Sequence, residues 1–280
     1  MRRSTRLLAI ALPVALATVP VALAGPDSAS GGAESPAAAQ APATPSPAAN
    51  VTSRPAYVRN VTLTRAAASA IEVARRRATP AAEVVALRAG AAVSLRSRPG
   101  GPVALRVGDT TQFGSSQRLG VIRRQGRWLG VTTPELPNGT LGWVDGSSSN
   151  IRIERTRWAI HADVSSRTIV LRRAGKSIRR LSVAVGRPGS PTPTGRFAVT
   201  DKLDGSRYGP YYGCCVLALN GEQPNLPVGW QGGNRLAIHG TNSPGTIGAA
   251  ASAGCLRASD GDLSFLMSRA PVGTPVVIRP

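Results

Sequence analysis

The chain has 280 residues and a formal net charge of +20, from 34 Lys and Arg against 14 Asp and Glu. Lysine occurs only at positions 176 and 202, so the charge rests on arginines that are scattered along the chain and form no recognisable nucleic-acid motif. This distribution argues against a nucleic-acid partner. Three cysteines and two histidines also lack the spacing of metal ligands, so we expect no metal and no other cofactor.

The N-terminus has the pattern of a secretory signal peptide at 1–24. Arginines at the start precede an apolar run at 7–23, which ends in a small-x-small cleavage pattern before Gly25. The run is short for a bilayer span and contains two prolines, so a retained membrane anchor is the weaker alternative. We expect an exported protein of the cell wall or an equivalent periplasmic space, with no stable membrane span after cleavage.

Residues 25–90 are predicted to be a disordered spacer. Up to about residue 53 the composition is Ala, Pro, Ser and Gly with almost no large apolar side chain, so this stretch cannot bury enough surface to fold. A short helix is expected at 66–77, before Pro80.

Residues 91–153 have the pattern of a small β domain. Short β-type runs at 92–95, 119–123, 128–132 and 141–144 are separated by turn sequences such as Asn138-Gly139. The order SLRSRPG, LGVI, GRWLGV and NGTLGWV resembles a bacterial SH3-like barrel. The resemblance implies an accessory module, since such barrels often accompany cell-wall enzymes.

The remaining segment, 157–280, is also predicted to be rich in strands. It begins with β-type runs at 158–163, 168–172 and 178–185. It ends with a helix at 261–268 capped by Ser259-Asp260 and a closing strand at 273–278. The proline-rich stretch GRPGSPTPTGRF at 186–197 reads as a rigid turn into a strand.

The stretch LAIHGTNSPGTIGAAASAGCLR at 236–257 holds the candidate catalytic pair. A short buried strand delivers His239, Gly240 lets the chain turn, and Cys255 follows Gly254. A thiol attacks as the thiolate, and we expect the imidazole of His239 to lower the pKa of Cys255. On residue types alone, a buried structural cysteine and a structural histidine remain the alternative.

Three motifs resemble the L,D-transpeptidase catalytic domain, also called the YkuD domain. They are IHGT at 238–241, SAGCLR at 252–257 and the proline-rich stretch at 186–197. Ala253 departs from the family pattern, because many members have a second histidine there, which puts any mechanism that uses a second histidine in doubt. The resemblance implies a mainly β fold: a β-rich catalytic domain with a short helix at 157–280, preceded by the SH3-like barrel.

The resemblance also implies the chemistry. A domain of this family would cross-link peptidoglycan: Cys255 would form a thioester with a stem peptide, His239 would act as general base and acid, and an amine of a second stem would complete a three-to-three cross-link. Reaction with carbapenem-type β-lactams is implied as well. The same acyl-enzyme would also suit an L,D-carboxypeptidase or a protein-to-peptidoglycan ligase, and a non-catalytic wall-binding protein is the second alternative.

Further residues are candidates for supporting roles. The amides of Gly254 and Cys255 are expected to form an oxyanion hole. Ser252 would orient His239 or close the turn, and Arg257 would brace the loop or attract a stem carboxylate. Anionic wall polymers are candidate partners for the arginine-rich surface.

Aromatic residues and a pair of neighbouring cysteines precede this stretch. Tyr211, Tyr212 and Trp230 lie in Gly- and Pro-rich loops and would line a substrate groove or serve as packing anchors. Cys214 and Cys215 are adjacent, and neighbouring cysteines bond only with strain, so we expect them to be buried, free or separately packed.

Overall fold

A computed structural model describes residues 81–280 of the chain. The signal peptide expected at 1–24, the helix expected at 66–77 and the spacer up to residue 80 lie outside the described residues. Within 81–280, no helix has the length and apolar character needed to cross a bilayer.

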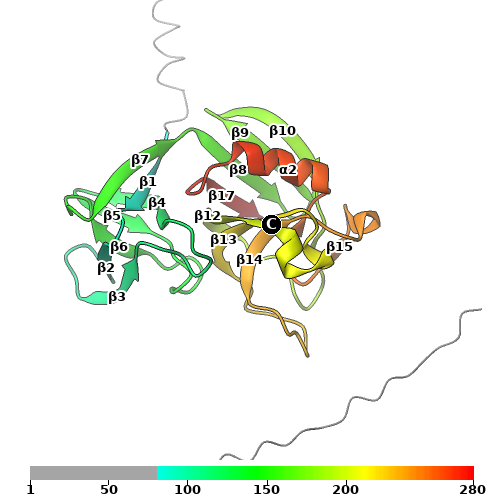
Figure 1. The fold of residues 1–280 in the computed structure, drawn as a ribbon, viewed down its shortest axis with the longest axis horizontal. Coiled ribbons are helices and arrows are strands. Elements are labelled where there is room, and N and C mark those ends of the chain that lie inside the picture. Colours follow the sequence, from blue (N-terminus) through cyan, green and yellow to red (C-terminus); the bar gives the residue numbers. More distant parts are fainter. Residues whose placement is uncertain (1–80) are drawn as a thin grey trace, which may run out of the picture. The chain divides into compact units, whose positions relative to one another are not determined.

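The first described part of the chain folds into an antiparallel seven-stranded sheet in the order β3-β2-β6-β5-β4-β1-β7 (Figure 1). Inward-facing apolar residues, such as Val93 and Leu95 on β2, form its core. The strands are β1 (Ala82–Leu87), β2 (Ala92–Arg96), β3 (Val103–Gly108), β4 (Arg118–Gln125), β5 (Trp128–Val131), β6 (Gly142–Asp145) and β7 (Ile151–Thr156).

This sheet begins earlier than the sequence predicted. Residues 82–87 were assigned to the spacer at 25–90, but they form β1, which pairs with β4 on one side and β7 on the other. The Ala- and Val-rich sequence of β1 has no alternation, because four of its six residues are buried, so its pattern did not separate it from its surroundings. The SH3-like character of 91–153 stays a prediction.

The second part of the chain forms an eight-stranded sheet in the order β10-β9-β8-β17-β12-β13-β14-β16, with a separate parallel pair of β11 and β15. Neighbouring strands are antiparallel except for β8 with β17 and β14 with β16. The strands are β8 (Trp158–Asp163), β9 (Thr168–Arg173), β10 (Lys176–Ser182), β11 (Val185–Gly186), β12 (Gly195–Asp204), β13 (Cys215–Glu222), β14 (Arg235–His239), β15 (Ala250–Ser252), β16 (Leu256–Arg257) and β17 (Pro275–Arg279).

One α-helix, α2 (Asp260–Arg269), covers the core of this sheet, and three short 3-10 helices lie in the loops. The helix begins where expected, because the Ser259 side chain accepts a hydrogen bond from the Asp262 amide at 3.2 Å. Leu263 and Leu266 are fully buried against the strand core. The 3-10 helices are η1 (Gly205–Tyr208), η2 (Pro210–Tyr212) and η3 (Pro244–Thr246).

Strand β14 pairs with a neighbouring strand on each side, which fixes the position of His239 relative to both neighbours. It pairs with β13 so that His239 faces Val216, and with β16 so that His239 faces Arg257. Its residues Leu236 and Ile238 are fully buried. The chain that carries Cys255 therefore enters β16 directly beside the strand that ends in His239.

Asn220 on β13 joins the two sheets through buried hydrogen bonds. Its side-chain amide donates to the Thr132 carbonyl at 2.9 Å, and its side-chain oxygen accepts from the Ala198 amide at 2.8 Å. Asn220 and Thr132 are both nearly inaccessible to solvent. Loss of this side chain would therefore leave buried polar groups of both sheets without partners.

We expect Asn220→Ala to lower the free energy of unfolding by about 1–3 kcal/mol, because the freed Thr132 carbonyl and Ala198 amide stay desolvated. Asn138→Ala is the matched control, since exposed Asn138 also bonds the backbone of β13, at Glu222, but its partners can turn to water. The control should cost less than about 1 kcal/mol. Urea unfolding of the full chain measures both, and equal losses would contradict this assignment.

Candidate active site

Cys255 lies in a tight turn between β15 and β16. The Ser252 hydroxyl donates to the Cys255 carbonyl at 2.6 Å and accepts from the Gly254 amide at 3.0 Å. Of the two roles expected for Ser252, the structure thus shows closure of the turn. The hydroxyl does not hydrogen-bond His239 in the described part of the chain.

The same hydrogen bonds reduce the number of backbone amides that are free to form the expected oxyanion hole. The Gly254 amide is already engaged by Ser252, and the Gly240 amide donates to the Cys215 carbonyl at 3.0 Å. The expectation that the Gly254 amide holds an oxyanion is therefore wrong for this structure. The Cys255 amide has no acceptor within residues 81–280, so it is the donor available to a developing negative charge.

Gly254 is required for a different reason. Its φ is +122°, and a Cβ at this position would lie 1.8 Å from the Gln223 side-chain nitrogen. That nitrogen donates to the Pro191 carbonyl at 2.8 Å and to the Ala253 carbonyl at 3.2 Å. Gln223 therefore fastens the proline-rich loop to the catalytic turn over the bare backbone of Gly254.

His239, at the end of β14, is fully buried. Its Nδ1 lies 2.7 Å from the Gly240 carbonyl oxygen, and since a carbonyl can only accept, Nδ1 carries the proton. Nε2 has no hydrogen-bond partner in the described residues and is left as a proton acceptor. Burial lowers the pKa of His239 to about 4, which keeps the imidazole neutral.

Cys255 is a free thiol, and its environment does not ionise it. Burial raises the pKa of Cys255 to about 11, against smaller opposing effects of a hydrogen bond to the Ala237 backbone and of the Arg257 charge. The expectation that His239 would lower this pKa is wrong, because the imidazole is itself neutral in a dry site. At rest the pair is a neutral thiol and a neutral imidazole.

His239 and Cys255 line the same narrow cavity of about 30 Å³. A volume of this size holds about one water, so a peptide must enter from the mouth or move the surrounding loops. Larger hollows, of about 790, 530, 480 and 210 Å³, include neither residue. The cavity is lined by Tyr211, Tyr212, Gln223, Leu226, Trp230, Gly233, Asn234, Arg235, His239, Ala253 and Cys255.

The three predicted aromatic residues form one wall of this cavity. The Tyr211 and Tyr212 rings have their centroids 5.5 and 4.9 Å from that of His239, and the Trp230 ring lies 6.4 Å from Tyr211. Burial raises the pKa of both tyrosines, so their hydroxyls stay protonated and can donate hydrogen bonds.

The backbone of Arg257 holds β16 in place. Its amide and carbonyl exchange hydrogen bonds with Ala184 at 2.9 and 2.8 Å, which braces β16. Its buried guanidinium lies 5.6 Å from the Tyr211 ring, and its Nε has no partner in the described residues. The guanidinium does not line the cavity.

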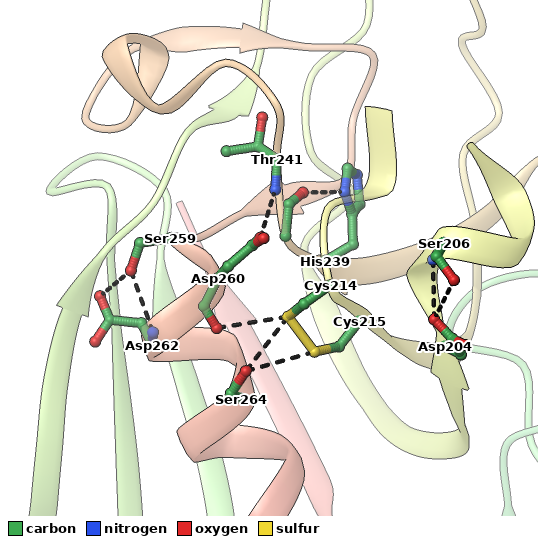
Figure 2. The surroundings of a disulfide bond; sticks show 11 residues. Asp204, Ser206, Cys214, Cys215, His239, Thr241, Ser259, Asp260, Asp262 and Ser264 are labelled. Atoms are coloured by element: carbon green, nitrogen blue, oxygen red, sulfur yellow. Dashed lines mark hydrogen bonds between the residues drawn. A yellow bond between two sulfur atoms is a disulfide. The ribbon is translucent and has the colours of Figure 1, made fainter. Parts of the chain in front are cut away.

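Two supporting residues were not predicted as part of the site: Gln223, and Asp260, which was expected only as part of a helix cap. Asp260 accepts a hydrogen bond from the Thr241 amide at 3.2 Å, just after His239 and Gly240 (Figure 2). Both residues act on segments distant in the chain, so no local pattern could reveal them. Residues 81–280 contain no group of three or more His, Cys, Asp or Glu that could hold a metal ion.

The two adjacent cysteines differ from their expected state. Cys214 and Cys215 are joined by a disulfide and are half-buried, instead of free or separately packed (Figure 2). The bond is possible because the chain turns sharply between η2 and β13 and directs both side chains toward α2. Cys255 is thereby the one free thiol among the described residues.

Comparison with known proteins agrees with the three motifs. Residues 157–278 match the family described as YkuD, the L,D-transpeptidase catalytic domain. The protein YkuD of Bacillus licheniformis, provisionally assigned as an L,D-transpeptidase, is 30% identical over 125 residues, which cover 44% of this chain and 66% of that protein. YqjB of Bacillus subtilis, with the same provisional assignment, is 36% identical over 106 residues, which cover 35% of this chain and 57% of YqjB.

The matched segments span less than two thirds of each of these relatives. Among solved structures, an L,D-transpeptidase from Mycobacterium smegmatis has 17% identity and a TM-score of 0.37, covering 72% of this chain and 100% of that chain. A TM-score of this size adds nothing to the chemical assignment. By the family match and the sequence relatives, residues 157–278 are similar to the L,D-transpeptidase catalytic domain of the YkuD family.

Proposed function

We propose that this protein is an exported peptidoglycan L,D-transpeptidase that forms three-to-three cross-links through a thioester at Cys255. The observation that carries the proposal is that one cavity is lined by a free thiol and by an imidazole whose Nδ1 is protonated and whose Nε2 is unpartnered. Such an imidazole can take the thiol proton during attack and return it to a leaving amine.

The first half-reaction forms the acyl-enzyme. Cys255 Sγ attacks the carbonyl carbon of the third residue of a tetrapeptide stem as its proton passes to His239 Nε2, and the Cys255 amide stabilises the oxyanion. The intermediate collapses, the peptide bond breaks, and the imidazolium gives its proton to the departing D-alanine amine. A thioester and a neutral imidazole remain.

The second half-reaction uses the same groups in reverse. A side-chain amine of a second stem attacks the thioester carbonyl and passes a proton to His239, and this proton returns to Cys255 Sγ as the carbon–sulfur bond breaks. An amide bond between the two stems is formed and the free thiol is restored. Attack by water would instead give L,D-carboxypeptidase activity, and attack by a protein amine would give ligation to the wall.

Burial of both groups favours proton transfer that is coupled to attack. The pKa of His239 is lowered to about 4 and that of Cys255 is raised to about 11, so separating charge before substrate binds is unfavourable. The thiol is therefore protected from adventitious reaction until a carbonyl and an oxyanion donor are in place.

Export is part of the proposal and rests on the sequence at 1–24, which has the charge and cleavage pattern of a signal peptide. Outside the cell, stem peptides are the substrates, and anionic wall polymers would attract a chain of formal charge +20.

We expect Cys255→Ala to abolish, and His239→Gln to slow by at least about a hundredfold, the formation of a covalent adduct with a carbapenem and of dimeric muropeptide from disaccharide-tetrapeptide. Intact-protein mass spectrometry and chromatography of the products measure both. His161→Gln is the matched control, because His161 lies on β8 and does not line the cavity.

If tripeptide is the sole product, the activity is that of a carboxypeptidase and not of a cross-linking transpeptidase. A folded wild-type protein that gives neither adduct nor product would leave the non-catalytic wall-binding alternative.

The acylation rate should be nearly constant from about pH 7 to about pH 5 and fall to half near pH 4, because the neutral imidazole is the active form and protonation removes its acceptor. Without substrate, alkylation of Cys255 by iodoacetamide should still be rising at about pH 10, since only the thiolate reacts and its pKa is about 11. Alkylation that levels off near pH 7 would instead indicate a preformed ion pair.

Gly254→Ala should reduce acylation about tenfold or more and destabilise the fold by about 1–3 kcal/mol, because the new Cβ displaces Gln223 and the residue keeps a left-handed φ. Gly245→Ala, in the preceding connection between β14 and β15, is the control, since a Cβ there meets open space. Thermal unfolding and single-turnover acylation compare them. If the Gly254→Ala protein acylates as fast and is as stable as the control, Gly254 is not needed to hold the turn that carries Cys255.

A further inference from the structure

The Cys214–Cys215 disulfide joins neighbouring residues, so it closes a small ring that contains the peptide bond between them. Disulfides stabilise a fold chiefly by closing long loops in the unfolded chain, and this one closes none. Its effect must therefore be local. Ser264 Oγ of α2 lies 3.4 Å from Cys214 Sγ and 3.7 Å from Cys215 Sγ, which sets the ring against the helix (Figure 2).

The backbone of this ring is one hydrogen bond away from the group that orients His239. The Cys215 carbonyl accepts from the Gly240 amide at 3.0 Å, and the Gly240 carbonyl in turn accepts from His239 Nδ1 at 2.7 Å. Gly240 sits so close to the turn that a Cβ there would lie 3.0 Å from the Cys214 nitrogen. A shift of the Cys214–Cys215 peptide would therefore move the carbonyl that fixes the imidazole tautomer.

The ring also fixes the end of the aromatic wall. Tyr211 and Tyr212 precede it with Gly213 between, and both tyrosine rings pack on the imidazole. Burial is the main cause of the low pKa of His239. The hydrogen bond that sets the tautomer and the side chains that exclude water thus depend on one turn.

We propose that the Cys214–Cys215 disulfide is a positioning element for His239, and that its reduction loosens the turn and slows acylation. The inference deepens the proposed function, on which its kinetic part rests. In the step, a dithiol such as dithiothreitol supplies two electrons and two protons: the sulfur–sulfur bond breaks, two thiols form, and the dithiol becomes a cyclic disulfide. Cys255 is not consumed.

The first test is an NMR titration of the full chain without substrate, oxidised and then reduced by dithiothreitol. The sequence has two histidines, so His161 on β8 is an internal reference. Reduction should let water reach the imidazole and raise the pKa of His239 from about 4 by about one pH unit or more, toward its ordinary value of about 6.5, with His161 unchanged. A His239 pKa that is the same in both states would overturn the proposal.

The second test uses variants and does not depend on how readily the bond is reduced. The Cys214→Ser/Cys215→Ser double variant should show the raised His239 pKa, acylate a carbapenem roughly ten to a hundred times more slowly than the oxidised protein, and ignore dithiothreitol. Ser264→Ala is the matched control, because it removes a contact to the sulfurs but keeps their bond. It should acylate like the wild type.

Reversibility separates positioning from damage. After removal of dithiothreitol, reoxidised wild-type protein should regain both its rate and its low His239 pKa. A folded double variant with the wild-type His239 pKa and rate would overturn the inference. If the wild type forms no acyl-enzyme, the proposed function fails, while the titration still decides whether the disulfide positions the histidine.

Discussion

The hydrogen bond from His239 Nδ1 to the Gly240 carbonyl is the interaction on which the rest of the site depends. It fixes which ring nitrogen is protonated, and no acidic side chain is needed for that purpose. The bond is possible because β14 ends in full burial between β13 and β16, with Leu236 and Ile238 anchoring the strand in the core. The geometry of the candidate site is therefore a consequence of strand register.

Burial is the second constraint, and it opposes the usual picture of a thiolate–imidazolium pair. Burial raises the pKa of Cys255 more than the neighbouring Arg257 charge lowers it. The same charge lowers the pKa of His239 and so disfavours the imidazolium. A neutral pair keeps the thiol unreactive until a substrate reaches the narrow cavity. In the proposed mechanism, charge develops only when the substrate carbonyl places its oxygen at the Cys255 amide.

Much of this arrangement could be predicted from the sequence. His239 and Cys255 stand in motifs with a clear resemblance, and β8, α2 and the cap at Ser259 follow from local patterns, since alternation and capping are properties of adjacent residues. Strand β1 was not predicted, because a strand buried on both faces shows no alternation of apolar and polar residues. Gln223 escaped because its role exists only when the loop at 186–197 meets the turn at Gly254.

The errors about the oxyanion hole and the cysteines have a common origin. Sequence reasoning assumed that the Gly254 amide was free and that adjacent cysteines would stay apart, and both assumptions concern how the backbone turns. The Gly254 amide is engaged by the nearby Ser252 hydroxyl, whereas Gln223 and α2, which contact the two turns, lie far along the chain. Gln223 contacts the turn that carries Cys255, and the Cys215 carbonyl accepts a hydrogen bond from the Gly240 amide next to His239. The motifs supply Cys255 and His239, the proposed nucleophile and base, and tertiary contacts decide the burial of both groups.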